Sequence, residues 1–157
     1  MALSALPTWP LLLFGVIEPV LLTWAYILCL KDPQAYYMQQ HPNQSLFQGF
    51  PAQALSLSLQ MGNVLLLLAA MAVICCFTNH SDISKKYLIA VAFADFGHIY
   101  AAYVALGDDY FWDVGKWNDM TWGNVGVSVF LNANRWLTVL GVFGAIGNRG
   151  RRGVKEN

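Results

Sequence analysis

The chain has 157 residues, of which 57% are hydrophobic and only 11% carry a charge. Soluble domains usually contain about 25% charged residues, so this composition indicates a membrane protein, and the length suits one compact domain. The formal net charge is zero, so no basic face for nucleic acid is implied. The three cysteines lie in or at the ends of apolar segments without metal-ligand spacing, which is typical of packing residues.

Four apolar stretches are long enough to cross a bilayer, which takes about 20 residues of helix. Their approximate bounds are 10–30, 52–77, 87–106 and 124–146. None of them alternates with a period of two residues, as the strands of a membrane barrel do. The first has no Lys or Arg before it and no small-residue cleavage site after it, so we expect a retained helix rather than a signal peptide. The sequence therefore predicts an all-α fold, an integral membrane four-helix bundle that forms a single domain over residues 1–157.

Basic residues outside the spans predict the orientation of this bundle. One side would carry Lys85, Lys86, Arg149, Arg151, Arg152 and Lys155, and the other only Lys31 and Lys116. Lys and Arg collect on the cytoplasmic side of membrane proteins. We therefore expect both termini and the loop 78–86 in the cytoplasm, with the loops 31–51 and 107–123 facing a lumen or the exterior.

Each span also carries polar side chains near its middle. They are Glu18, Gln60, Asn63, Asp95, His98, Asn132, Asn134 and Arg135. Spacings of three or four residues place the polar residues of one span on one helix face. At a rise of 1.5 Å per residue, five of these positions lie about 12–21 Å from the cytoplasmic edge, in the middle of a hydrocarbon layer about 30 Å thick: Glu18, Asn63, Asp95, His98 and Arg135. We expect the polar faces to turn inward and to form a polar chamber.

Charged residues in this chamber favour chemistry over simple helix association. A charge at the centre of a spanning helix costs roughly 2.5–3.5 kcal/mol unless it is paired or hydrated. Arg135 can neutralise one of Glu18 and Asp95, and two carboxyl groups in such different surroundings would supply an acid and a base at one pH. The alternative is that the polar groups only hydrogen-bond the helices together, which suits Gln60 or Asn63 better than the charged group.

Few reactions need only a proton donor and a proton acceptor in an apolar pocket. They are epoxide opening by water or by an internal hydroxyl, cation-type cyclisation and double-bond isomerisation. The sequence contains no G-x-S-x-G, H-E-x-x-H, P-loop or G-x-G-x-x-G motif. We therefore expect no cofactor and no metal, and a lipophilic small-molecule substrate that enters from the bilayer.

A second group of candidates lies at the lumenal mouth, just before the fourth span. Asp119 could act as an additional acid, and the faces of Trp122 and its neighbours could stabilise a developing cation, with Asn124 beside them. The alternative is an interfacial aromatic anchor with a helix cap at Thr121 or Asn124. Tyr100 is a further candidate for substrate contact, although a tyrosine there also suits packing. Small residues in the fourth span would allow close packing in a homodimer: Gly123, Gly126, Gly141, Gly144 and Gly147.

Three segments together resemble a family of small four-span fungal membrane proteins: VIEPV at 16–20, FADFGHIYAAY at 93–103 and WNDMTWGNVG at 117–126. Members of that family include epoxide hydrolases and membrane-bound terpene cyclases of the ascofuranone type, in polyketide and meroterpenoid pathways. The resemblance implies a four-helix bundle and acid–base opening of an epoxide in a terpenoid or polyene chain. By position it singles out Glu18, Asp95, His98, Asp119, Trp122 and Asn124.

These observations lead to the hypothesis of a cofactor-independent membrane enzyme of the endoplasmic reticulum in fungal secondary metabolism. Its expected catalytic residues are Glu18, Asp95, His98 and Asp119. Its expected substrate-binding residues are Gln60, Asn63, Tyr100, Trp122, Asn124, Asn132 and Arg135. Water and an internal hydroxyl both remain open as the nucleophile, and either carboxyl group could be the acid. The alternatives are a sterol-type double-bond isomerase and a non-catalytic lipid-binding membrane protein.

Overall fold

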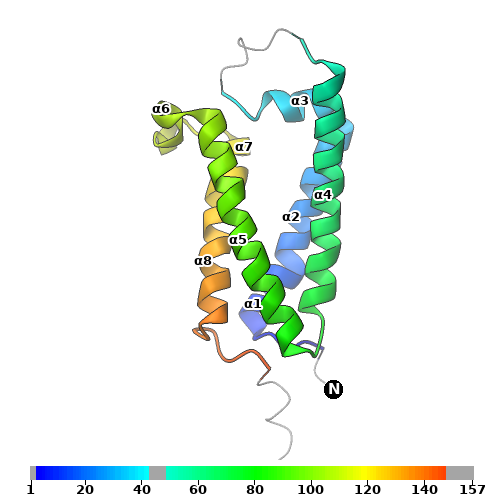
Figure 1. Ribbon diagram of the computed structural model, residues 1–157, viewed down its shortest axis with the longest axis vertical. Helices are drawn as coiled ribbons and strands as arrows, with labels where there is room; N and C mark the ends of the chain where they lie inside the picture. Colours follow the sequence, from blue (N-terminus) through cyan, green and yellow to red (C-terminus); the bar gives the residue numbers. More distant parts are fainter. Residues whose placement is uncertain (1–2, 43–48, 148–157) are drawn as a thin grey trace, which may run out of the picture.

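The computed structural model describes residues 3–42 and 49–147, and every regular element in these ranges is helical (Figure 1). The first long helix runs without a break through α1 (Thr8–Leu12), a π-helical turn (Leu13–Ile17) and α2 (Glu18–Lys31). The second and third are α4 (Ala52–Cys76) and α5 (Ser81–Leu106). The last runs through α7 (Asp119–Thr121), a π-helical segment (Trp122–Val127) and α8 (Ser128–Val139). Short helical pieces, namely α3 (Pro33–Met38), α6 (Asp108–Phe111) and a 3₁₀ turn (Val114–Lys116), lie between them.

Three of these helices are long and apolar enough to cross a membrane: Thr8–Lys31, Ala52–Cys76 and Ser81–Leu106. Their outward surfaces are apolar as well, since Leu57, Leu67 and Phe93 are each more than 60% exposed. Long helices with such apolar outward surfaces are rare on soluble proteins. The structure therefore confirms the all-α class and three helices of membrane-spanning length.

The fourth predicted span differs from the helix that the structure contains. The helix occupies Asp119–Val139 rather than 124–146. It ends at Gly141 (φ 82°), whose N–H bonds to the Thr138 carbonyl, while the Val142 N–H bonds to the Leu137 carbonyl. This pair of hydrogen bonds is a Schellman motif, which needs a left-handed residue that glycine supplies readily. Hydropathy extended the prediction past this turn because the residues after it are also apolar.

Two helices also begin five or six residues earlier than predicted, and both differences have local causes. The last helix begins early because the Asn118 side chain accepts a hydrogen bond from the Thr121 N–H at 2.7 Å, which caps its first turn. α5 begins at Ser81, six residues before the predicted 87, and has Asp82 in its first turn, where a carboxylate favours the helix dipole. A polar first turn has low hydropathy, so a prediction based on hydropathy begins the helix too late.

The long helices form two antiparallel pairs, α2 with α4 and α5 with α8 (Figure 1). In the first pair, the Cys29 thiol donates to the Ser58 carbonyl at 3.0 Å, beside Gly62. In the second pair, the Phe93 and Trp136 rings meet edge to face at 5.7 Å. Small residues thus bring the first pair together, and aromatic packing holds the second.

The two pairs meet at the end of the bundle that carries the N-terminal segment, here called the closed end. The Ala5 N–H bonds to the Thr78 carbonyl, and the Gly147 N–H bonds to the Ala5 carbonyl. A buried apolar cluster fills this end: Leu6, Leu13, Phe14, Ala72, Cys75, Cys76, Tyr87, Leu88, Val91 and Leu131. The opposite end, here called the loop end, carries α3, α6 and α7 (Figure 1).

We predicted that both termini and the loop 78–86 face the same side of the membrane. Where the structure describes these segments, they lie together at the closed end. Residues 4–7, the turn after α4 and residues 141–147 contact one another there. Lys85 and Lys86 belong to the second turn of α5 at the same end. The remaining basic residues of that prediction, Arg149, Arg151, Arg152 and Lys155, lie outside the described residues.

Replacing Gly141 with alanine should destabilise the protein by about 1–2 kcal/mol, because a left-handed residue with a Cβ is strained by that amount. Gly123→Ala is the matched control, since a Cβ there meets nothing within 4 Å and the residue is helical. Thermal unfolding in detergent would measure both. Equal unfolding midpoints for the two variants would show that the left-handed conformation of Gly141 does not cause strain when the residue carries a Cβ.

Candidate functional site

Glu18 lies where the first helix departs from regular α geometry. Pro19 follows it and has no backbone N–H, which removes one α-helical hydrogen bond. The preceding turn is π-helical, and the Glu18 N–H bonds to the Leu13 carbonyl five residues earlier. Helical turns of this type occur often at functional sites. The local sequence thus places a carboxyl group that is only 3% exposed beside a widened turn.

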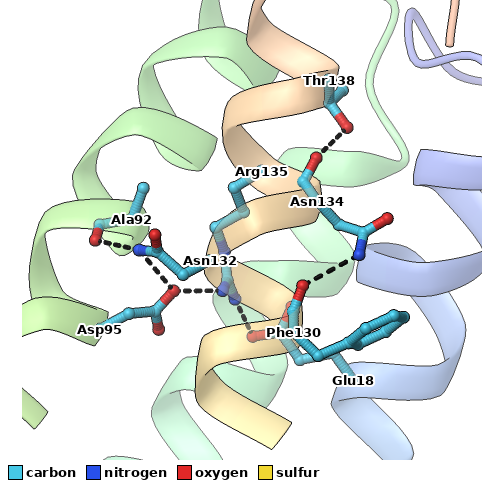
Figure 2. Close-up of polar contacts among 8 residues, drawn as sticks. All are labelled: Glu18, Ala92, Asp95, Phe130, Asn132, Asn134, Arg135 and Thr138. Atoms are coloured by element: carbon cyan, nitrogen blue, oxygen red, sulfur yellow. Dashed lines mark hydrogen bonds and ion pairs between the residues drawn. The ribbon is translucent and has the colours of Figure 1, made fainter. Parts of the chain in front are cut away.

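The guanidinium group of Arg135 joins carboxyl groups from two other helices (Figure 2). Its Nη1 lies 2.5 Å from Asp95 Oδ2, and its Nη2 forms an ion pair with Glu18 Oε1. The Arg135 side chain has no exposed surface, while the side chains of Glu18 and Asp95 are 4% and 13% exposed. The structure therefore brings together the three charged residues that the sequence placed at one depth. We refer to Glu18, Asp95 and Arg135 as the charged triad.

Asp95 is the member of the charged triad that remains partly accessible. Asn132 Nδ2 donates to the Ala92 carbonyl at 2.6 Å and lies 3.4 Å from Asp95 Oδ2 (Figure 2). Arg135 contacts the same oxygen. Both contacts involve Oδ2, so Asp95 Oδ1 is the oxygen that can meet a substrate within the described part of the chain.

The charged triad adjoins the apolar cluster of the closed end. Arg135 Cζ lies 5.1 Å from the centroid of the Phe14 ring, which is a cation–π distance, and Phe14 belongs to that cluster. Among the described residues, Glu18 Oε2 and Arg135 Nε are buried without a hydrogen-bond partner. Groups that served only to join helices would be expected to satisfy one another. This pattern favours a site over a purely structural contact.

His98 continues the polar line from Asp95 toward the loop end. Its ring interacts electrostatically with Asp95, and the Asn124 side chain lies within hydrogen-bonding reach. In contrast to the charged triad, His98 is exposed. Asn124 Nδ2 in turn donates to Gln40 Oε1 at 2.8 Å, in the turn after α3. The structure thus places Asn132 beside the charged triad and His98 next to Asp95, whereas Asn124, which the sequence assigned to the lumenal mouth, contacts Gln40.

The substrate-binding role expected for Gln60 and Asn63 stays a prediction. Both residues are exposed, and the Gln60 amide donates to Ser56 Oγ on its own helix at 3.0 Å. α4 instead turns Ser58 and Gly62 toward α2. Because successive residues of a helix are 100° apart, Gln60 and Gly62 lie on nearly opposite faces. The spacing of the polar residues showed that they share a face, but it did not identify which neighbour that face meets.

Asp119 and Tyr100 also lie apart from the charged triad. Asp119 is exposed in α7, and the continuous helix separates it from Arg135 by about 24 Å at 1.5 Å per residue. Tyr100 is 66% exposed, with its ring 6.4 Å from that of Tyr103. The catalytic role expected for Asp119 and the substrate contact expected for Tyr100 stay predictions.

Trp122 is positioned by its own helix. Its indole lies over Gly126, where an added Cβ would come within 2.6 Å of the ring. The Trp117 ring meets it edge to face at 5.1 Å. Trp122 is 49% exposed and lies in the same π-helical segment as Asn124. The absence of a side chain at Gly126 therefore determines where this indole lies.

Several residues of the site were not identified from the sequence. Trp9 Nε1 donates to Asn134 Oδ1 at 3.0 Å. Figure 2 shows the other contact of Asn134, whose Nδ2 donates to the Phe130 carbonyl at 2.9 Å. Asn134 was noticed as a polar residue of its span, but its partner was not. Phe14 and Gln40 carried no signal, since one resembles any aromatic residue of a span and the other any polar loop residue.

No group of three His, Cys, Asp or Glu side chains within residues 3–42 and 49–147 could hold a metal ion. The chemistry that these residues offer is proton transfer by a carboxyl group and an imidazole, with an amide at Asn132 and a fixed positive charge at Arg135.

The chain belongs to the family described as a domain of unknown function, DUF7704, whose model matches residues 3–145. Comparison with curated proteins and with solved structures finds no match. The family assignment covers the charged triad and both π-helical segments, and it assigns no reaction to them.

Replacing Arg135 with methionine should destabilise the protein by about 3–5 kcal/mol, because it leaves buried carboxyl groups without their positive partner. Adding Glu18→Gln and Asp95→Asn to the same chain should restore most of this loss, because no unpaired charge would remain. Unfolding in detergent would measure both variants.

Lys116→Met is the matched control for that experiment, because the Lys116–Asp113 ion pair is exposed and surface pairs contribute little. A triple variant no more stable than Arg135→Met would contradict the buried-charge explanation. So would an Arg135→Met variant that is as stable as the parent protein.

Proposed function

We propose that this protein is a membrane-embedded acid–base enzyme that opens an epoxide of a lipophilic terpenoid or polyketide substrate, by hydrolysis or by cyclisation. The observation that carries this proposal is the buried guanidinium group that joins two carboxyl groups, one of them partly accessible, beside an exposed imidazole. Epoxide opening needs a proton donor at the oxygen and a proton acceptor at the nucleophile, and it needs no cofactor.

Asp95 would be the acid. A buried group with one guanidinium and two carboxyl groups carries a net charge unless one carboxyl group holds a proton, and net charge is unfavourable in an apolar interior. Only Asp95 is accessible enough to meet a substrate, so in the reactive state Glu18 would remain ionised in its ion pair with Arg135. The proton would then reside on Asp95, whose Oδ1 faces away from Arg135 and Asn132 and can reach the epoxide oxygen.

His98 would be the base. It is exposed and adjoins Asp95. As Asp95 donates its proton and the epoxide C–O bond breaks, His98 would accept a proton from water or from a substrate hydroxyl as the new C–O bond forms. The products are a diol or a cyclic ether, and no external oxidant or reductant is required. Transfer of the proton from His98 to Asp95 would return the site to its starting state.

The surroundings of the site suit a lipophilic substrate. The apolar cluster of the closed end blocks one side of the charged triad, so a substrate would approach Asp95 from the loop end or from between the helix pairs. Trp122 lies toward the loop end, where its indole could stabilise positive charge that develops on the substrate. Asn132 would orient the carboxyl group of Asp95.

The membrane arrangement that we propose has four spans, with the closed end in the cytoplasm and the loop end in the lumen of the endoplasmic reticulum. Asp119–Val139 would then be the fourth span, packed against α5. Lys85 and Lys86 at the closed end support this orientation.

Microsomes that contain the protein should convert prenyl or polyene epoxides, and Asp95→Asn should lower kcat/KM by about 10²- to 10⁴-fold, the usual effect of one general acid. Asp109→Asn is the matched control, since the same substitution falls on an exposed residue of α6 that has no part in the proposed reaction, and we expect it to retain activity. Mass spectrometry of products formed in ¹⁸O-labelled water would follow the reaction.

Labelled diol that disappears with Asp95→Asn would identify a hydrolase, and an unlabelled cyclic isomer that disappears would identify a cyclase. Equal activity in Asp95→Asn and the parent would show that Asp95 takes no part in the reaction. Turnover of no epoxide, together with deuterium uptake into an isomerised double bond, would favour a sterol-type isomerase instead. A ligand that binds without any turnover would favour a lipid-binding protein.

The orientation makes a separate prediction, because the sequence has two N-x-S glycosylation acceptors, Asn43 and Asn79. Asn43 lies between α3 and α4 in the sequence, and Asn79 lies in the turn before α5 at the closed end. In microsomes, a glycosidase-sensitive shift should therefore disappear with Asn43→Gln and persist with Asn79→Gln. A shift that depends on Asn79 would reverse the orientation.

A further inference from the structure

The segment between α5 and the last helix folds into a compact hairpin. It comprises α6, the following 3₁₀ turn and the next residue, and we refer to residues 108–117 as the loop-end hairpin. Tyr110 Oη donates to the Lys116 carbonyl at 2.9 Å, and Trp117 Nε1 donates to the Phe111 carbonyl at 3.1 Å. These two hydrogen bonds hold the two halves of the hairpin together.

A small apolar cluster attaches the loop-end hairpin to the end of α5. Phe111 is buried with Leu106 and Val125, and the Phe111 and Tyr103 rings meet edge to face at 5.1 Å. Tyr103 Oη also donates to Asp108 Oδ1 at 2.7 Å. The hairpin is therefore held against the end of α5 by both apolar and polar contacts.

Two apolar side chains of the loop-end hairpin remain exposed outside this cluster. Trp112 is 72% exposed, although its ring meets that of Phe111 edge to face at 5.0 Å, and Val114 is 46% exposed. On α5, Tyr100 and Val104 are 66% and 61% exposed. α6 lies beside the loop end of α5, on the side away from α4 (Figure 1). Exposed apolar residues therefore occur both on α5 and on the hairpin next to it.

The length of α5 sets the depth of the loop-end hairpin in a membrane. Lys86 lies near the start of α5 at the closed end, and Leu106 is the last residue of that helix. At 1.5 Å per residue, these positions are about 30 Å apart, which is the thickness of the hydrocarbon layer. Lysine side chains favour the headgroup level, where the ammonium group reaches water. With Lys86 at one surface of the membrane, the hairpin that follows Leu106 lies at the other.

We propose that the loop-end hairpin is a docking surface for the membrane itself, with Trp112 and Val114 inserted at the headgroup level of a phospholipid leaflet. Indole rings prefer this level because they are apolar and carry one N–H donor. The hairpin has three carboxylates and one ammonium group, so anionic headgroups would repel it, whereas zwitterionic headgroups such as phosphatidylcholine suit it. The proposal rests on the helices of membrane-spanning length and not on the proposed reaction.

A hairpin docked in this way would also fix the depth of α5. One end of the helix would be anchored by Lys85 and Lys86 and the other by Trp112, so α5 could not slide along the membrane normal. Asp95, which lies about 16 Å before Leu106 along the helix, would then stay in the middle of the hydrocarbon layer.

The test is ¹⁹F NMR of the full chain carrying fluorotryptophan, in nanodiscs of phosphatidylcholine. The chain has six tryptophans, and Trp112→Phe identifies the Trp112 signal by its loss. Two spectra are compared, one with a nitroxide near the top of the lipid acyl chain and one with a gadolinium chelate in the water. The Trp112 signal should be broadened more by the nitroxide lipid than by the chelate.

Trp24 is the control for contact with lipid, because it is 57% exposed on a helix of membrane-spanning length. If the chelate broadens Trp112 more than the nitroxide lipid does, the hairpin is a hydrated loop and the proposal is overturned. Protection of Trp112 from both agents would also overturn it, since protein would then cover the ring. Anionic phosphatidylglycerol added to the nanodiscs should shift the broadening of Trp112 toward the chelate, and an unchanged ratio would contradict the preference for zwitterionic headgroups.

Discussion

The ion pairs of Arg135 are the interaction on which the arrangement of the helices depends. They join α8 to α2 and α5, helices that belong to different antiparallel pairs. Since a charged side chain at the centre of an apolar bundle is strongly unfavourable without a partner, the three helices must keep the register that brings Glu18 and Asp95 to Arg135. Apolar contacts at the closed end are compatible with many small shifts of one helix along another, whereas the charged triad selects one of them.

The same argument explains how much of the site could be predicted from the sequence. Charged residues in an apolar bundle have few acceptable surroundings, so Glu18, Asp95 and Arg135 could be expected to meet. The position of Asn132 near this group could also be predicted, because Asn132 shares a helix face with Arg135. The positions of Gln60 and Asn63 did not follow, because their spacing identified a helix face without identifying its neighbour.

Helix ends and the outer part of the site were harder to predict for a related reason. Hydropathy measures where apolar residues lie, but the last helix ends at the hydrogen bonds around Gly141 and begins at the cap of Asn118. The link through Gln40 depends on a turn that meets the last helix across a separation of 84 residues in the sequence. No local pattern of residue types indicates such a contact, and the two π-helical segments carry no pattern that hydropathy detects.

The members of the charged triad differ in how accessible they are to a substrate. Glu18 and Arg135 are almost completely buried, so their charges fix the fold and the charge balance but cannot meet a substrate. Asp95 differs from both, since Oδ2 contacts Arg135 while the carboxyl group is partly exposed. In the proposed function, a proton on Asp95 is therefore governed by buried charges on one side and is available to a substrate on the other. Under that proposal a single carboxyl group would act as an acid in a nearly dry interior, because Glu18 and Arg135 supply the balancing charges in advance.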